Sequence, residues 1–164
     1  MDGAAPDHST RAQTPSATVH ASAVLLGARA VLIRGPSGSG KSRLALDLIE
    51  AGRRGALLFS RLLADDRVHL DAANGHLLAR PAGPLAGLIE VRGMGLLRMP
   101  HEPCAIIGWV VDLAAADPER LPDASRRHTE IHGIKLPRLA VAAGIEPLPA
   151  VLTFITSSPE GWVG

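Results

Sequence analysis

The stretch best suited to chemistry runs from residue 35 to residue 42 and reads Gly-Pro-Ser-Gly-Ser-Gly-Lys-Ser. It fits the phosphate-loop pattern G-x-x-x-x-G-K-[ST] at every fixed position. The glycines let the backbone curl so that successive N–H groups point at an anion. Lys41 would place its charge on the β- and γ-phosphates of a nucleotide, and the Ser42 hydroxyl would reach Mg²⁺. The predicted nucleotide-binding residues are Gly35, Pro36, Ser37, Gly38, Ser39, Gly40, Lys41 and Ser42.

The segments on either side supply the strand and the helix that such a loop requires. Residues 30–33 form an apolar run long enough for a buried strand, and residues 43–50 carry apolar side chains at helical spacing. Gly52 stands where a helix C-cap is expected. Lys41 is one of only two lysines among 17 basic Lys and Arg residues, so lysine stands where a compact ammonium group is needed.

The composition indicates a single cytoplasmic α/β domain. With 164 residues the chain can bury a core of its own, and we assign residues 1–17 to a disordered tail and residues 18–164 to the domain. No apolar run is long enough to span a membrane, and the first residues lack the pattern of a secretory signal. A formal charge of +1 and an aromatic content of 2% argue against a nucleic-acid surface.

Strand and turn signals elsewhere predict a mixed sheet. Residues 19–26 and 29–34 read as a hairpin closed at Gly27-Ala28, which places an antiparallel pair beside the phosphate loop. Asn74-Gly75 is a strong turn signal between two more short strands. Further predicted segments are a central strand over 104–111, a loop over 117–122, a strand over 136–143 and a short helix over 149–156.

A second candidate site lies at the end of the apolar run 56–64, where Asp65 and Asp66 follow. Asp65 comes 24 positions after Lys41. In phosphate-loop proteins an aspartate at a strand end lies beside the magnesium ion or its water, so the pair resembles that second signature. An aspartate pair that caps a turn is the alternative interpretation.

A third candidate is the extended stretch 88–97, in which Glu90 and Arg92 are two residues apart and are therefore expected on the same side. Gly93 and Gly95 follow, and a strand edge with a loop is the simpler interpretation.

Two histidine arrangements are not predicted to hold a metal. His128 and His132 are four residues apart, but Glu130 is displaced from the zinc-protease pattern H-E-x-x-H, so solvated histidines are expected. His101 and Cys104 lack the second set of ligands that a zinc site needs.

Together these motifs resemble the catalytic domain of the HPr kinase/phosphorylase family. The likeness follows the order His20, the phosphate loop, Leu-Ala-Asp-Asp-Arg-Val at 63–68 and Glu-Val-Arg-Gly-Met-Gly at 90–95, and it runs from about residue 19 to residue 139. The chain is similar to the short bacterial forms that have only the C-terminal catalytic domain. The resemblance implies a phosphate-loop core with a mixed, largely buried sheet and flanking helices, related to phosphoenolpyruvate carboxykinase.

The resemblance also implies roles for individual residues. Asp66 would take the proton of a seryl hydroxyl, and Arg120 falls where the family has a catalytic arginine. ATP and Mg²⁺ are the implied cofactors, HPr is the implied protein substrate, and the family assembles as a hexamer. The implied sites are catalytic His20, Lys41, Asp66 and Arg120, magnesium ligands Ser42 and Glu90 with Asp65 as a further candidate, and signature-loop residues Arg92, Gly93 and Gly95.

Four departures from the family pattern predict a kinase with weak or no phosphorylase activity. Arg43 stands where the family usually has a glutamate, and the segment between Gly95 and Cys104 is shorter than in long members. The segment 140–146 has no basic residue where the family has a loop that carries proline and arginine, and the C-terminal helices that support the hexamer are largely absent. A small-molecule phosphate-loop kinase and a nucleotide-binding regulator without catalysis are the alternatives. The first would need an arginine-rich lid, which only Arg126-Arg127 remotely resembles.

Overall fold

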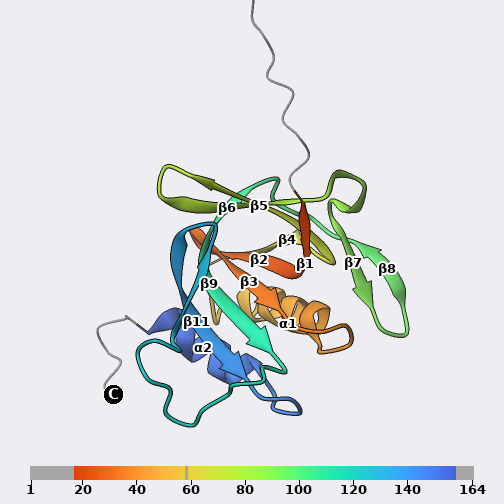
Figure 1. Ribbon diagram of the computed structural model, residues 1–164. Coiled ribbons are helices and arrows are strands. Elements are labelled where there is room, and N and C mark those ends of the chain that lie inside the picture. The colour runs from red at the N-terminus through yellow and green to blue at the C-terminus, as the bar shows by residue number, and fades with distance from the viewer. Residues whose placement is uncertain (1–16, 58, 158–164) are drawn as a thin grey trace, which may run out of the picture.

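The computed structural model describes residues 17–57 and 59–157, so nearly all of the predicted tail lies outside the described residues. Within them, nine strands form one mixed sheet and two form a separate hairpin (Figure 1). The strands of the large sheet are β1 (Thr18–His20), β2 (Ser22–Leu26), β3 (Arg29–Arg34), β4 (Ser60–Ala64), β5 (Arg67–Ala73), β6 (His76–Pro81), β9 (Ala105–Leu113), β10 (His128–Ile131) and β11 (Ile134–Val141). The hairpin consists of β7 (Leu88–Val91) and β8 (Gly95–Arg98), and the helices are α1 (Lys41–Arg53), a short 3-10 turn η1 (Gly83–Leu85) and α2 (Leu148–Thr156).

The sheet follows the order β1-β5-β6-β9-β3-β2-β4, and β11 pairs with β9 and with β10. Strand β2 is antiparallel to both β3 and β4, while β9 is parallel to β3 and to β11. Strands β3, β4, β9 and β11 therefore run in one direction, and their carboxyl ends meet at one edge of the sheet. The phosphate loop follows β3 and the aspartate pair follows β4, so this topology brings the two predicted sites to the same edge.

Both faces of the central strands are covered, because residues 30–33 of β3 are all fully buried. On one face, Val31 and Ile33 pack in a cluster with side chains of α1 and α2. On the other face, Leu32 packs with side chains of β5 and β6. These two strands belong to the same sheet, but the sheet bends so that they lie over its central strands (Figure 1). The predicted mixed and largely buried sheet is confirmed, and both α-helices lie on the same face of it.

The prediction that Gly52 is the C-cap of α1 was wrong, because the helix extends beyond it. The helix ends at Arg53, Arg54 is its C-cap, and Gly55 follows with φ +80°. The N–H groups of Gly55 and Ala56 donate to Gly52 and Ala51, which satisfies the last carbonyls of the helix. Gly52 is needed for packing instead, since a Cβ there would lie 1.9 Å from Ser60 Oγ on β4.

Tertiary pairing divides the strand predicted over residues 19–26. Residues 18–20 pair with β5, whereas residues 22–26 pair with β3 and β4, so the segment splits at Ala21. The hairpins at Gly27-Ala28 and at Asn74-Gly75 are confirmed, and Asn74 and Gly75 have the positive φ values of 50° and 74° that the turn requires. The strand predicted over 56–64 begins only at Ser60.

Candidate active site

The phosphate loop joins β3 directly to the first turn of α1, as its motif requires. Gly35, Gly38 and Gly40 have φ values of 150°, 78° and 96°, which favour glycine. Gly35 has a steric reason as well, because a Cβ there would lie 2.6 Å from Ser39 Oγ and 2.8 Å from the carbonyl oxygen of Leu113. No side chain caps the start of α1, so its first N–H groups and the positive end of its dipole face the loop.

Two side chains of the loop, those of Lys41 and Ser39, have polar groups that are shielded from solvent. Lys41 is 6% exposed, and its Nζ donates to the carbonyl oxygens of Gly35 and Pro36 at 2.9 Å each. Burial lowers the pKa of Lys41 below its ordinary value, although the charges of Asp65 and Asp66 oppose that shift. The Ser39 hydroxyl oxygen is buried without a hydrogen-bond partner among the described residues. A buried hydroxyl of this kind needs a partner, and a phosphate oxygen would provide one.

Asp65 connects the loop to the end of β4. Its carboxylate is buried and accepts hydrogen bonds from Ser42 Oγ at 2.9 and 3.0 Å and from the N–H of Glu90 at 3.1 Å. Ser22, which is fully buried on β2, donates its hydroxyl to Asp65 at 2.5 Å. The sequence analysis missed Ser22. The signal that could have found it is a lone hydroxyl within an apolar strand, because a buried polar group requires a partner.

Asp66 has the opposite environment, although it is the next residue. Its φ of 67° turns the backbone between β4 and β5, and its side chain is 59% exposed. Asp66 Oδ1 lies 3.2 Å from Nε2 of His20, which comes from the end of β1. Asp66 Oδ2 lies 3.8 Å from Nε of Arg67. The interruption between β1 and β2 at Ala21 therefore places His20 beside the aspartate pair, since His20 is paired opposite Arg67 on β5.

The predicted signature loop forms the hairpin of β7 and β8. The prediction that Glu90 and Arg92 lie on the same side of one strand was wrong, because β7 ends at Val91 and Arg92 lies in the turn. Gly93 and Gly95 have φ values of 83° and 86° at that turn. The Glu90 carboxylate is exposed and has no hydrogen-bond partner among the described residues, while its backbone N–H holds Asp65.

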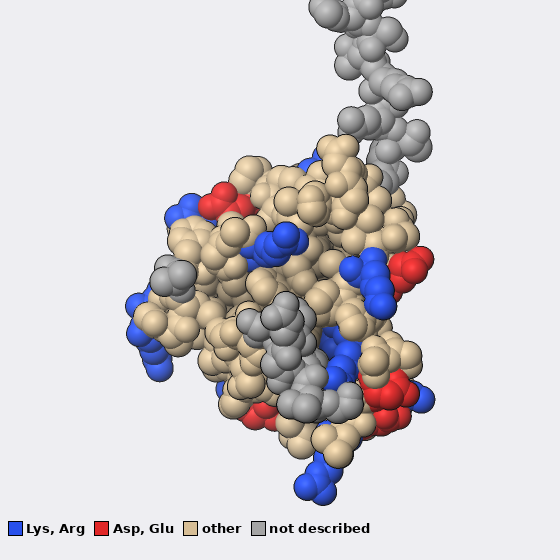
Figure 2. Space-filling view, turned by 90° about the vertical axis from the view of Figure 1, so that its left-hand side faces the viewer, with Lys and Arg blue, Asp and Glu red and all other residues tan. Residues whose placement is uncertain are grey.

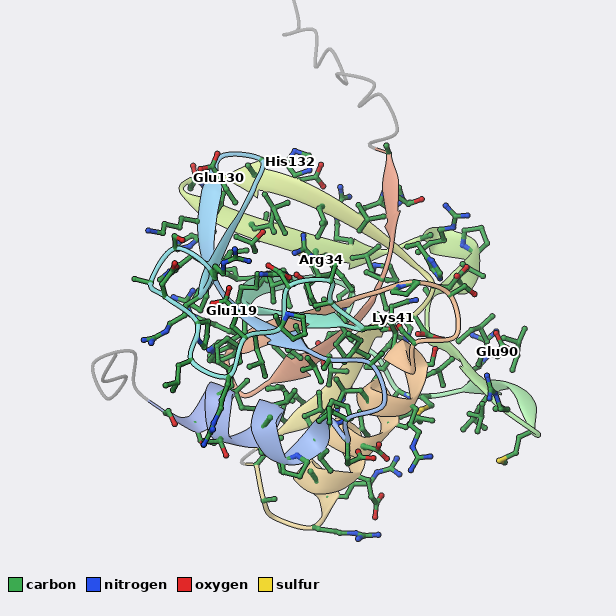
Figure 3. The ribbon with its side chains drawn as sticks, turned by 60° about the horizontal axis from the view of Figure 1, so that its bottom comes forward. Arg34, Lys41, Glu90, Glu119, Glu130 and His132 are labelled. Carbon is green, nitrogen blue, oxygen red and sulfur yellow. The ribbon has the colours of Figure 1, made fainter. Side chains whose placement is uncertain are left out.

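Arg120 lies on the long loop after β9, and in residues 17–57 and 59–157 no hydrogen bond or ion pair joins it to the phosphate loop. It lines an open cavity together with residues of that loop and of α2, among them Asp117, Arg126 and Thr153. In Figure 3, Lys41 lies between Glu90 on one side and Glu119, the neighbour of Arg120, on the other. A catalytic role for Arg120 therefore stays a prediction.

Figure 2 shows that basic and acidic side chains are interspersed on the face that lies at the left of Figure 1.

An ion-pair network that the sequence analysis missed lies behind the phosphate loop. Arg34, the residue before Gly35, donates to both carboxylate oxygens of Asp112 at 2.7 and 2.8 Å. Arg138 on β11 donates to Asp112 at 2.5 Å and to both oxygens of Asp117 at 2.8 and 2.9 Å. Burial would raise the pKa of Asp112, but the hydrogen bonds from the two arginines outweigh it and lower that pKa. The network fixes the root of the phosphate loop to β9 and β11.

His128 and His132 are surface side chains, whereas His101 is partly buried beside Gly87. His128 begins β10 and His132 lies in the turn that follows it, and His128 Nδ1 contacts the carbonyl oxygen of Ala124 at 3.0 Å. In the part of the chain that the structure describes, no group of three or more His, Cys, Asp or Glu side chains could hold a metal ion. A magnesium ion bound mainly through nucleotide phosphates needs fewer protein carboxylates than that.

Comparison with known proteins identifies the fold and its family. The family model described as "HPr Serine kinase C-terminal domain" matches residues 11–145. The chain belongs to this family. The matched region extends beyond the residues 19–139 over which the sequence resemblance was seen. Among the described residues, no helix is long and apolar enough to cross a membrane.

Individual relatives agree with that assignment. The HPr kinase/phosphorylase of Geobacillus thermodenitrificans is 34% identical over 141 residues, which are 77% of this chain and 42% of the relative. That of Streptococcus thermophilus is 31% identical over 135 residues, which are 76% of this chain and 41% of the relative. The chain thus spans about two fifths of the length of these relatives. The structure of the HPr(Ser) kinase/phosphatase from Coxiella burnetii matches with a TM-score of 0.67 and 27% identity, covering 84% of this chain and 93% of that one.

Proposed function

We propose that this chain is an ATP- and Mg²⁺-dependent protein kinase that phosphorylates a serine of the phosphocarrier protein HPr. The observation that carries the proposal is the divided aspartate pair, with Asp65 buried against Ser42 of the phosphate loop and Asp66 exposed beside it. Phosphoryl transfer depends on positioning and charge stabilisation, and this arrangement provides a group for each. The names of the relatives support the choice of HPr as substrate.

The phosphates of ATP would bind to the N–H groups at the start of α1, to the Ser39 hydroxyl and to Lys41. Lys41 would exchange the carbonyl oxygens that it now contacts for phosphate oxygens, which are stronger partners because they carry charge. Oxygens of Ser42, Asp65 and Glu90 would hold Mg²⁺, the type of ligand that this ion prefers. The ion would neutralise charge on the phosphates.

Asp66 is the group available to the incoming alcohol. Its exposed carboxylate would accept the seryl proton while the seryl oxygen forms a bond to the γ-phosphorus. The bond between that phosphorus and the bridging oxygen breaks, and ADP leaves with the electron pair. His20, at 3.2 Å from Asp66, would hold the carboxylate in one orientation. The assignment of Asp66 rather than Asp65 follows from exposure, because a protein serine cannot reach a carboxylate that is 4% exposed.

We also propose that the reverse reaction, removal of phosphate from seryl-phosphorylated HPr, is weak or absent. Inorganic phosphate would need a cation near the phosphate loop. The segment after β11 instead presents the exposed side chains of Ile145 and Glu146 at the same edge of the sheet. A carboxylate and an apolar side chain do not favour a second phosphate.

Incubation with γ-labelled ATP and Mg²⁺, in the presence of HPr or of a panel of small metabolites, tests the function. Label on an HPr serine is expected. Label on a metabolite would favour a small-molecule kinase, and no label on either, despite nucleotide binding, would indicate a regulator. The proposal about direction fails if the protein dephosphorylates seryl-phosphorylated HPr with inorganic phosphate as fast as it phosphorylates HPr.

A further inference from the structure

Three of the six large apolar side chains that are exposed in the described structure lie on the hairpin of β7 and β8. Met94 at its turn is 75% exposed, and Leu96 and Leu97 on β8 are 69% and 40% exposed. All four residues of β8 are exposed, and β8 pairs only with β7. Figure 1 shows this hairpin projecting from the body of the molecule beside α1. Leu96 is opposite Glu90 and Leu97 is opposite Ile89, so the two leucines point to different faces of the hairpin. Several exposed apolar side chains on one projecting element are typical of an interaction site.

The base of the hairpin, in contrast, is fixed. Ile89 is 1% exposed and packs in the core cluster with α1, and Met99, just after β8, is 8% exposed in the same cluster. The N–H of Met99 donates to the carbonyl oxygen of Gly87 at 2.8 Å. The N–H of Glu90 donates to Asp65. The apolar tip is thus held at a defined position relative to the carboxylates of the active site.

The arginines of the hairpin make no ion pair within the part of the chain that the structure describes. Arg92 and Arg98 are exposed, and neither makes an ion pair with a carboxylate within residues 17–57 and 59–157. Elsewhere on the surface, by comparison, Arg61 pairs with Glu102 and Arg80 pairs with Asp71. Two unpaired guanidinium groups beside apolar side chains fit a partner whose own apolar patch is bordered by acidic residues.

We propose that the hairpin 88–98 is the docking surface for the protein substrate, an apolar patch bordered by aspartate or glutamate next to the serine that is phosphorylated. This inference rests on the proposed function. The backbone N–H of Glu90 on β7 donates a hydrogen bond to Asp65, and Asp66 is the next residue. A protein whose serine reaches Asp66 therefore brings the surface around that serine against the hairpin. A small metabolite at Asp66 would leave Met94, Leu96 and Leu97 in water.

The test uses the double variant Met94→Ser/Leu96→Ser, with Phe59→Ser as control. Phe59 is another exposed apolar residue, at 38%, but it lies at the amino end of β4, whereas the active site lies at the carboxyl end of that strand. The double variant is expected to lower kcat/KM for HPr by about tenfold or more, mainly through a higher KM, because a few residues at the desolvated centre of an interface carry most of its binding energy. Its affinity for Mg²⁺-ATP by calorimetry should equal that of the wild type, and Phe59→Ser should change neither quantity.

The contribution of the hairpin's arginines to docking is tested by the salt dependence of KM for HPr. Arg98→Gln is expected to raise KM for HPr at low salt, and the difference from the wild type should shrink as salt is added. An unchanged kcat/KM in the double variant overturns the docking surface while leaving the proposed kinase intact. A lower kcat/KM that is accompanied by a smaller assembly in light scattering also overturns it, because the hairpin would then join copies of this chain. A wild-type protein that binds Mg²⁺-ATP but neither binds nor labels HPr overturns both proposals.

Discussion

Removal of the Ser22 hydroxyl tests whether the buried position of Asp65 is held by the contacts described above. Ser22 is fully buried, and its Oγ lies 2.5 Å from Asp65 Oδ1. In Ser22→Ala the carboxylate keeps its bonds to Ser42 and to the N–H of Glu90 but loses one of its three donors. The rest of the strand is unchanged, because alanine fits wherever serine does.

The size of the effect follows from the charge of the acceptor. A hydrogen bond to a charged group contributes about 1.5–3 kcal/mol to the free energy of unfolding, and a neutral one about 0.5–1.5 kcal/mol. For a domain of this size, about 1 kcal/mol corresponds to roughly 2–4 °C in Tm, so Ser22→Ala should lower Tm by roughly 3–12 °C. Differential scanning calorimetry and urea unfolding measure both quantities.

A matched control comes from the neighbouring strand. Ser60 Oγ on β4 donates to the carbonyl oxygen of Ile49 at 3.0 Å, which is a neutral acceptor, so Ser60→Ala should cost less than Ser22→Ala. A double-mutant cycle with Asp65→Asn should show coupling of about 1.5–3 kcal/mol between Ser22 and Asp65. Equal losses of stability in the two serine variants, or a cycle without coupling, would show that the Ser22 hydroxyl does not hold the Asp65 carboxylate.

Three further predictions concern the phosphate loop and its surroundings. Lys41→Ala should lower Mg²⁺-ATP affinity by calorimetry about tenfold or more, because a charge-assisted contact is lost, and unchanged binding and turnover would contradict the phosphate-loop assignment. Asp66→Asn should keep that affinity but lose about 100-fold or more in kcat for phosphoryl transfer, and retained transfer would show that Asp66 is not the base. Asp112→Asn should lower the free energy of unfolding by roughly 1.5–3 kcal/mol at pH 7. Because the pKa of Asp112 is lowered in the folded state, its contribution is complete above the unfolded pKa and is lost as pH falls through the folded pKa. The difference between wild type and Asp112→Asn in urea unfolding should therefore shrink below about pH 4, and a difference that is constant with pH would contradict the ion-pair explanation.

The features that the sequence predicted correctly are those that depend on neighbours in the chain. The phosphate loop is set by its glycines and by the strand and helix on either side of it. The turn at Asn74-Gly75 is set by two residues that accept positive φ. The hairpin of β2 and β3 follows from two apolar runs separated by a two-residue turn. In each case the local backbone preference and the tertiary structure agree, so the pattern alone was sufficient.

The features that the sequence did not predict depend on partners far along the chain. The bond between Ser22 and Asp65 spans 43 residues, and that between Arg34 and Asp112 spans 78. No local spacing reveals such a pair. The interruption of the strand at Ala21 also depends on a distant partner, because residues 18–20 pair with β5 instead of continuing β2. Gly52 was misassigned since its role is to admit Ser60 of β4 rather than to end the helix.

One backbone angle explains how two adjacent aspartates can serve different purposes. In a regular strand, neighbouring side chains point to opposite faces, but both faces of this sheet are covered, so alternation alone would bury both carboxylates. β4 ends at Ala64, and the φ of 67° at Asp66 turns its side chain outward toward His20, while Asp65 stays inside with Ser22 and Ser42. A non-glycine residue in this conformation costs about 1 kcal/mol, and aspartate tolerates it better than most residues do. Asp66→Gly should therefore keep or raise stability while abolishing phosphoryl transfer. A variant that instead unfolds would show that the Asp66 side chain, rather than the turn, holds this corner together.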